Sequence, residues 1–400
     1  MWKPLCALLL TTSCTQTVSG GLYLVETAPL ETTIGSSDLP EFHETWRALI
    51  DGAQNSLDLA HFYASNEPGS RLEPIVVALE GAAARGVTVR FLVDERFYGT
   101  YPETLDRLVA GGGVTVRRLS LKPLTGGVLH AKYMIADGNA VCIGSANFDW
   151  RALEHIQELG AVVESEAIAR AVRDVFNLDW WIAGGSPAGS RPVRSVEPDG
   201  FPQTLPMANA DAVRVTPVFS PKELLPSEEL WDLPYLLAWI EQAQEKVWVQ
   251  VMTFRMTGRD GERFDELDSA LRHAAARGVD VRLLVADWGK RPGTIEGLKE
   301  LSQVNGIEIK MVTLPPAAQG HIPFARVIHS KYMLADRARA WVGSSNWEKG
   351  YFYESRNVGL LIEGEACAGR LSQYFEEGWS GPYSYFLDPN VEYEIPRVGE

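Results

Sequence analysis

Cysteine, histidine and positive charge are all scarce in this chain. Only four of its 400 residues are cysteines, none at CxxC spacing, and no HExxH or paired-aspartate pattern occurs. We therefore expect no metal site and no cofactor. The formal net charge of −15 excludes a broad basic surface that coats a duplex. A narrow cleft for a single phosphate remains compatible, because only local charge matters there.

Long apolar runs are also few. Residues 1–20 combine one lysine, a short apolar run and small residues, which is typical of an export signal and too short for a permanent membrane span. Cleavage after Val18-Ser19-Gly20 is one alternative. In the other, Leu10–Cys14 resembles a bacterial lipobox, and Cys14 would be lipidated and would attach the chain to a membrane. In both cases we expect an exported protein, which is periplasmic, lipid-anchored or secreted.

One eight-residue pattern is present twice. Histidine occurs only seven times in the chain, yet two histidines repeat in register with a lysine, an aspartate, a serine and an asparagine. His130 and His329 are 329 − 130 = 199 residues apart, and the loops that follow keep this spacing. The doubling indicates one active site built from two halves. The copies are HAKYMIAD (130–137) with GSAN (144–147), and HSKYMLAD (329–336) with GSSN (343–346).

Each copy reads as a strand that carries phosphate-binding groups. Residues two apart on a strand share a face, so His130 and Lys132 are expected to point the same way, as are His329 and Lys331. A histidine next to a fixed positive charge suits attack on a phosphodiester. A single His-x-Lys is usually a surface pair without a role. Two copies with all spacings retained favour a function.

The loops after the two patterns add neutral donors. Ser145 and Ser344 contribute hydroxyl groups, and Asn147 and Asn346 contribute amides. Both groups can donate hydrogen bonds to phosphate oxygens. We therefore expect the serines to bind substrate.

Asp137 and Asp336 receive a different interpretation. Each follows its lysine by five residues, at a strand end, where aspartate commonly caps a turn. Asp137-Gly138 is also a strong two-residue hairpin signal. We interpret both aspartates as structural supports.

The duplication extends over the whole chain and predicts two α/β domains. Val- and Leu-rich runs such as GVTVRFLVD and GVDVRLLVAD alternate with helical patterns, as in a mixed sheet covered by helices. A Pro-, Gly- and Ser-rich segment without periodicity separates the halves. The expected boundaries are 1–20 for the signal peptide, 22–183 for the first domain, 184–210 for the linker and 211–400 for the second domain.

HxKxxxxD followed by GSxN, in two copies, resembles the signature of the phospholipase D superfamily. The strings around both copies, with GPYSYFLDP near the end, are most similar to one branch. That branch contains the animal lysosomal 5′ exonucleases of the phospholipase D family and the related poxvirus envelope proteins. The resemblance implies two duplicated α/β sandwich domains of the phospholipase D fold, packed as a pseudo-dimer around one cleft.

The resemblance also implies roles. His130 would be the nucleophile that forms a phosphohistidine, and His329 the acid and base. Lys132, Lys331, Asn147 and Asn346 would hold the phosphate oxygens. Glu158 resembles the acidic residue that orients a histidine in this superfamily. Its counterpart in the second half is open between Asn357 and Glu354.

The substrate remains open among three hypotheses. The branch resemblance implies a phosphodiesterase, specifically a 5′ exonuclease on single-stranded nucleic acid. The alternative is a phospholipase D or transphosphatidylase that acts on phospholipids. A silent membrane or assembly protein is disfavoured because both motif copies are intact. The sequence makes no prediction about oligomeric state.

Four other residues are further candidates. His61 and Tyr63 end a predicted strand and could line the cleft. His321 and Arg326 precede the second motif and could contact substrate.

Overall fold

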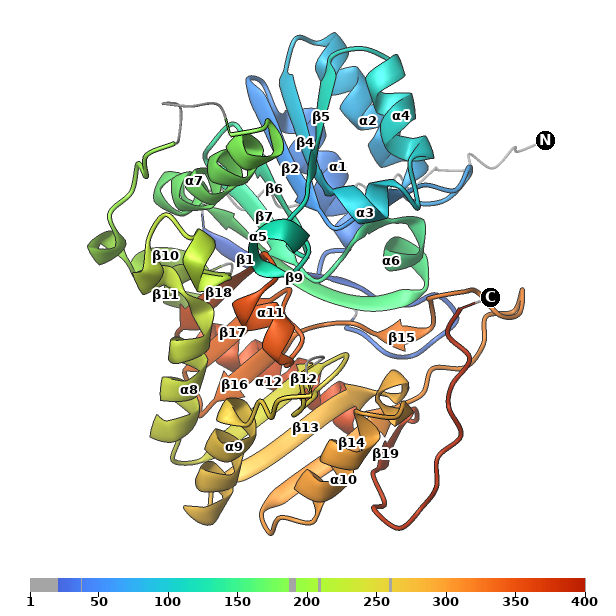
Figure 1. Cartoon of the computed structure of the whole chain (residues 1–400), viewed down its shortest axis with the longest axis vertical. Coiled ribbons are helices and arrows are strands. Elements are labelled where there is room, and N and C mark those ends of the chain that lie inside the picture. Colours follow the sequence, from blue (N-terminus) through green and yellow to red (C-terminus); the bar gives the residue numbers. More distant parts are fainter. Residues whose placement is uncertain (1–20, 37, 187–191, 208–209, 259–260, 400) are drawn as a thin grey trace, which may run out of the picture.

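The protein consists of two halves of similar architecture, one above the other in Figure 1. This computed structural model describes residues 21–36, 38–186, 192–207, 210–258 and 261–399. The expected export signal and Cys14 lie outside the described residues. The predicted fold class is confirmed, since each half contains a mixed sheet covered by helices.

The first half follows the predicted alternation of helices and strands. Its strands are β1 (Leu22–Thr27), β2 (Ser56–His61), β3 (Ala64–Ser65), β4 (Thr88–Asp94), β5 (Val114–Leu119), β6 (Tyr133–Ala136), β7 (Ala140–Gly144), β8 (Phe148–Asp149) and β9 (Ile156–Glu164). Its helices are α1 (Phe42–Gly52), α2 (Glu73–Ala84), α3 (Glu95–Tyr98), α4 (Glu103–Ala110), α5 (Lys122–Thr125), α6 (Trp150–Glu154) and α7 (Glu166–Ala183).

The second half repeats this order. Its strands are β11 (Ala210–Ser220), β12 (Lys246–Val251), β13 (Asp280–Ala286), β14 (Ile307–Val312), β15 (Val327–Ile328), β16 (Tyr332–Ala335), β17 (Arg339–Gly343), β18 (Asn357–Glu363) and β19 (Ser384–Phe386). Its helices are α8 (Asp232–Gln242), α9 (Glu266–Ala276), α10 (Ile295–Ser302), α11 (Lys349–Tyr353) and α12 (Glu365–Ser380), with short 3₁₀ turns η1 (Pro198–Gly200), η2 (Lys222–Leu224), η3 (Glu228–Leu230) and η4 (Asp287–Lys290).

The two sheets have the same strand order. The first is β5-β4-β2-β6-β7-β9-β1, in which β2, β4 and β5 are parallel. The second is β14-β13-β12-β16-β17-β18-β11, with β19 added beside β14. The parallel strands are Val- and Leu-rich because helices cover both of their faces.

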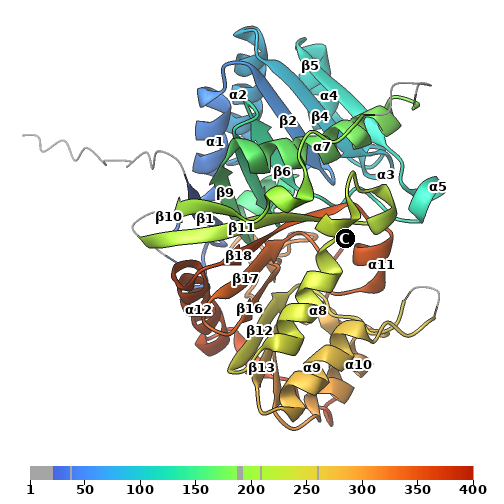
Figure 2. The same cartoon turned by 90° about the vertical axis from the view of Figure 1, so that its left-hand side faces the viewer.

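The segment expected as a linker contains a strand. β10 (Gln203–Met207) pairs with β11 and touches β1 at Leu22, so it lies between the two sheets (Figure 2). We propose that the first domain ends at residue 183 and the second begins at residue 211, as expected from the sequence. β11 has the same position in the second sheet that β1 has in the first.

Three hydrophobic cores hold the layers together. One lies between the first sheet and α1, α2 and α4, and a second between the second sheet and α8, α9 and α10. The third contains side chains of α7 and α12 together with both sheets. The halves therefore share a core, and burial of apolar surface fixes their relative position.

A buried ion pair adds a directional link between the halves. The Arg356 guanidinium donates to both oxygens of Asp179 on α7, at 2.7 Å each. It also donates to the carbonyl oxygens of Ser220 and Leu224. Neither ionic side chain is exposed, so each charge depends on the other for compensation.

We predict that Arg356→Met strongly destabilises the fold, because Asp179 would remain buried without a counter-charge. The expected loss is about 3–5 kcal/mol in the free energy of unfolding, measured by urea titration. Arg47→Met is the matched control. It breaks an exposed Arg47–Asp51 pair and should cost about 0.5 kcal/mol or less. Equal losses in the two variants would contradict the role of the buried pair.

Candidate active site

Each histidine motif enters the site on a segment that is bonded to the opposite half. The His130 amide donates to the carbonyl oxygen of Arg356 at 2.8 Å, and the His329 amide donates to that of Gln157 at 2.8 Å. β15, just before His329, pairs in parallel with the start of β9. The expectation that His130 and Lys132 lie on a regular strand is wrong in detail. β6 begins only at Tyr133, because the preceding segment pairs across the halves instead.

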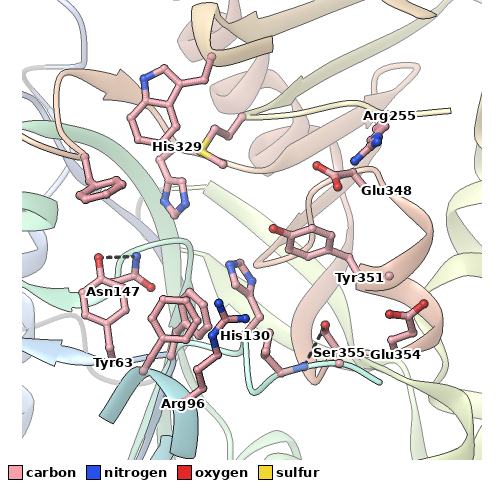
Figure 3. A pocket seen from close by; sticks show the side chains of 18 of the residues that line it. Tyr63, Arg96, His130, Asn147, Arg255, His329, Glu348, Tyr351, Glu354 and Ser355 are labelled. Carbon is pink, nitrogen blue, oxygen red and sulfur yellow. Dashed lines mark hydrogen bonds between the residues drawn. The ribbon is translucent and has the colours of Figure 1, made fainter. Parts of the chain in front are cut away.

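The two imidazoles face one cleft. Its volume is about 600 Å³, and His130, His329 and Asn147 are among its lining residues. Figure 3 shows both imidazole rings directed into the same space. The matched spacing in the sequence therefore corresponds to one site assembled from both halves.

His329 is supported by a carboxylate from the first half. Both Glu158 oxygens lie 2.9 Å from His329 Nδ1, and Ser145 Oγ donates to the same carboxylate. Burial raises the pKa of Glu158 to about 7, although Lys331 partly opposes this. Burial also lowers the pKa of His329, with further lowering by Lys331 and Lys132.

His130 is supported by a neutral amide from the second half. Asn357 Oδ1 lies 3.1 Å from His130 Nδ1. The amide orientation is set by its other end, since Nδ2 donates to the carbonyl oxygens of Tyr351 and Ser355. His130 Nδ1 must then carry the proton, which leaves Nε2 with a free lone pair. Of the two candidates for the counterpart of Glu158, the structure places Asn357 in the equivalent position.

The two lysines are buried beside the histidines. Lys132 Nζ donates to the His130 carbonyl oxygen at 2.5 Å, and Lys331 Nζ donates to that of His329. Burial lowers the pKa of Lys331 to about 7, and burial together with Lys331 lowers the pKa of Lys132 well below its usual value. Lys331 is thus near enough to disfavour a charge on Lys132, and an anion bound beside both amino groups would offset this repulsion.

The serines differ from expectation. Ser145 and Ser344 are fully buried, and neither lines the cleft. Ser344 Oγ donates to Asn357 Oδ1 at 3.0 Å and accepts from the Val358 amide, just as Ser145 binds Glu158 and Leu159. Each hydroxyl already donates its single proton to the residue behind a histidine, so the expected donation to substrate does not fit these contacts. We propose instead that both serines orient the residues that hold the histidines.

The two asparagines are not equivalent. Asn147 lines the cleft, and its Nδ2, the group that can donate to a phosphate oxygen, makes a long hydrogen bond of 3.5 Å to the Tyr63 hydroxyl. Asn346 is fully buried, accepts from the Thr253 amide and donates to the Tyr351 hydroxyl at 3.1 Å. Only Asn147 can therefore reach a bound phosphate without rearrangement.

The two aspartates hold loops and do not face the cleft. Asp137 accepts from the amides of Gln54, Asn55 and Ser56, and Asp336 accepts from the equivalent amides of 244–246. Both adopt positive φ, and the hairpin connections have three residues, 137–139 and 336–338, where the first was expected to have two. The carboxylates thereby fix the hairpins to the preceding strands β2 and β12.

The further candidates have mixed outcomes. Tyr63 lines the cleft, whereas His61 is buried against Trp46, Phe91 and Phe148. His321 binds a carbonyl oxygen near the C-terminal end, and the Arg326 guanidinium donates to two carbonyl oxygens.

The cleft also has an aromatic lining that the sequence did not predict. It comprises Phe62, Phe97, Tyr101, Trp288, Phe324 and Tyr351. Three of them lie in loops and three in short helical segments, none within the repeated motifs that the sequence marks.

Two other features bear on the site class. Within the described ranges, no group of three His, Cys, Asp or Glu side chains could hold a metal ion. Cys142 and Cys367 are both buried free thiols. In the part of the chain that the structure describes, no helix is both long and apolar enough to span a bilayer.

Comparison with known families agrees with this geometry. The family model described as "Cardiolipin synthase, PLD-like domain" matches residues 46–180 and 236–379, which is more than half of the chain. The chain belongs to the phospholipase D superfamily. The resemblance seen in the motifs is thus confirmed.

Individual relatives narrow the branch. The chain is 32% identical over 400 residues to "5'-3' exonuclease PLD3" of Homo sapiens, with 92% of this chain and 81% of the relative covered. It is 31% identical to "5'-3' exonuclease PLD4" of Mus musculus, covering 92% and 80%. It is 28% identical to "Phospholipase D Z" of Dictyostelium discoideum, covering 92% and 91%. A solved phosphatidylserine synthase from Haemophilus influenzae shares the fold, with a TM-score of 0.61, 13% identity and coverage of 86% and 85%.

We predict that anion binding takes up protons. A sulfate between Lys132 and Lys331 would raise both lysine pKa values from their lowered levels, so protons must enter near pH 8. Calorimetric titration in two buffers of different ionisation enthalpy measures this uptake, and sulfate itself does not titrate there. Lys331→Met should remove most of the uptake. Identical heats in both buffers for the wild-type protein would contradict the prediction.

Proposed function

We propose that the protein is a phosphodiesterase that hydrolyses single-stranded nucleic acid from a 5′-hydroxyl end through a phosphohistidine on His130. The observation that carries the chemistry is the asymmetric support of two histidines on one cleft. Burial and the neighbouring Lys132 and Lys331 keep His130 neutral, and the Asn357 amide fixes its proton on Nδ1. The carboxylate of Glu158 favours a proton on His329. A nucleophile and an acid need these opposite protonation states.

In the first step His130 Nε2 attacks phosphorus and the bond to the leaving oxygen breaks. His329 donates its proton to that oxygen. Lys132, Lys331 and Asn147 bind the non-bridging oxygens, whose charge offsets the repulsion between the lysines. A bound phosphodiester anion also raises the His329 pKa, so His329 becomes protonated when substrate binds.

In the second step His329 accepts a proton from water, which attacks phosphorus. The phosphorus–nitrogen bond breaks, and His130 returns to its neutral state. With a 5′-hydroxyl end, the products are a nucleoside 3′-monophosphate and a strand with a new 5′-hydroxyl. The two lysines supply the positive charge, so we propose that no metal is needed.

The relatives and the cleft support the nucleic-acid substrate. The relatives that are more than 30% identical are named as 5′-3′ exonucleases. A cleft of about 600 Å³ admits one strand end, whereas a duplex would have to fray to enter. The net charge of −15 agrees with recognition of one phosphate and not of a long backbone.

The second candidate is a phospholipase D. It would use the same residues, and an alcohol or water would attack the phosphohistidine in the second step. The relative from Dictyostelium discoideum named "Phospholipase D Z" is the observation that favours it.

We also propose that the protein is exported. The composition of residues 1–20 supports this, either with cleavage after Gly20 or with a lipid on Cys14.

We predict that His130→Ala and His329→Ala lose different steps of the reaction. On an oligonucleotide, His329→Ala should lose about 10²–10⁴-fold in rate, because the alkoxide departs without its proton. On a nitrophenyl phosphodiester, whose leaving group needs no acid, it should still release nitrophenol and accumulate the phosphohistidine. His130→Ala should do neither. Burst kinetics with mass spectrometry measures this, and a covalent adduct in His130→Ala would contradict the assignment.

We predict that a 5′-hydroxyl single strand is degraded to nucleoside 3′-monophosphates in the presence of a chelator. The wild-type protein should act more slowly on a duplex and show a shallow salt dependence, because few phosphates are contacted. Product analysis on end-labelled oligonucleotides is the measurement, with phosphatidylcholine and phosphatidylglycerol vesicles in parallel. Intact oligonucleotides beside hydrolysed phospholipid would establish the second candidate instead.

A further inference from the structure

The cleft has two aromatic rims, one from each half. The first rim consists of Phe62, Phe97 and Tyr101, and the second is centred on Trp288. The rings of the first rim are only half-buried, and among the described residues they belong to none of the three hydrophobic cores. Their clustering therefore adds little to folding and leaves ring surface available for a ligand.

The first rim lies on the side of His130. The Phe62 and His130 ring centroids are 5.0 Å apart, and those of Phe62 and Phe97 are 3.9 Å apart. Asp94 fixes this arrangement. Its carboxylate accepts from the amides of Arg96 and Phe97 and, at 2.9 Å, from the amide of Leu129, beside His130. Asp94 thus links the rim directly to the segment that carries His130.

The second rim lies on the side of His329. Trp288 follows β13 and lines the cleft with Val327, which is two residues before His329. Arg255, also from the second half, lines the cleft beside Glu348 (Figure 3), and its buried Nε has no hydrogen-bond partner among the described residues. This rim therefore offers a ring for stacking and a guanidinium for a phosphate.

The chemistry gives the cleft a direction. In an in-line displacement the leaving oxygen departs opposite the attacking nitrogen. If His130 attacks and His329 protonates, the leaving oxygen lies beside His329 and the second rim. In the reaction proposed above, that oxygen is the 5′-oxygen of the second nucleotide. The rest of the strand must then follow the second rim.

We propose that the terminal nucleoside stacks on Phe62, Phe97 and Tyr101, and that the second nucleotide passes over Trp288 with its phosphate at Arg255. This inference rests on the proposed exonuclease function and adds the direction of the strand. Stacking tolerates every base because each has an aromatic face. The first rim would therefore bind the terminal nucleoside whichever base it carries.

The test compares two variants on three substrates. The substrates are a 5′-hydroxyl oligothymidylate, the same strand with an abasic first nucleoside, and the same strand with an abasic second nucleoside. Phe97→Ala should lower kcat/KM about tenfold or more on the full strand, but hardly at all when the first base is missing. Trp288→Ala should show the same pattern for the second base. Phe97→Leu keeps apolar bulk without the ring and should behave as Phe97→Ala does.

Phe386→Ala is the matched control. Phe386 is 57% exposed, lies outside the cleft on β19, and should leave all three rates unchanged. Equal losses on all substrates, or a Phe97→Ala loss that follows the second base, would overturn the proposed direction. If the wild-type protein hydrolyses none of the strands, the proposed function fails and the direction fails with it. Hydrolysis by the wild type without the predicted pattern overturns the direction alone.

Discussion

The active site depends on reciprocal support between the two halves. Each histidine takes both its backbone partner and its ring partner from the opposite half, at Arg356 and Asn357 for His130 and at Gln157 and Glu158 for His329. Neither half alone can therefore hold its own histidine in place. The shared hydrophobic core and the buried Asp179–Arg356 pair, one residue from Asn357, keep these contacts in register.

The duplication is symmetric in backbone but not in charge. Asn357 and Glu158 are 357 − 158 = 199 residues apart and lie in equivalent positions, yet one is a neutral amide and the other a carboxylate. A carboxylate stabilises an imidazolium more than an amide does, so the two histidines receive different protonation preferences. This difference between a glutamate and an asparagine is the basis of the proposed nucleophile and acid roles in an otherwise repeated site.

The sequence predicts the structural features that occur in both halves, but not the contacts and cleft residues that depend on tertiary placement. The alternating strands and the two hairpins follow from periodicity, because local pattern determines them. Glu158 was implied by the resemblance to the superfamily and not by the pattern itself. The choice between Asn357 and Glu354 could not be made, because it depends on pairing between distant segments. The sequence led us to expect Ser145 and Ser344 to bind substrate, because their contacts with Glu158 and Asn357 also depend on strand pairing that the local pattern does not show. Phe62 lies in a loop after β2, Phe97 in the short helix α3 and Trp288 in the 3₁₀ turn η4, and tertiary placement brings all three to the cleft.

The central claim is that His130 stays unprotonated because it is buried beside two lysines and has a neutral amide, Asn357, where His329 has a carboxylate. The pH dependence of kcat/KM in Asn357→Asp tests it most directly, because this variant adds one carboxylate behind His130 and changes little else. That anion raises the His130 pKa, so the acid limb of the profile should move to higher pH by about one unit or more, with activity retained on the alkaline side. An acid limb that stays at its wild-type pH would contradict the account.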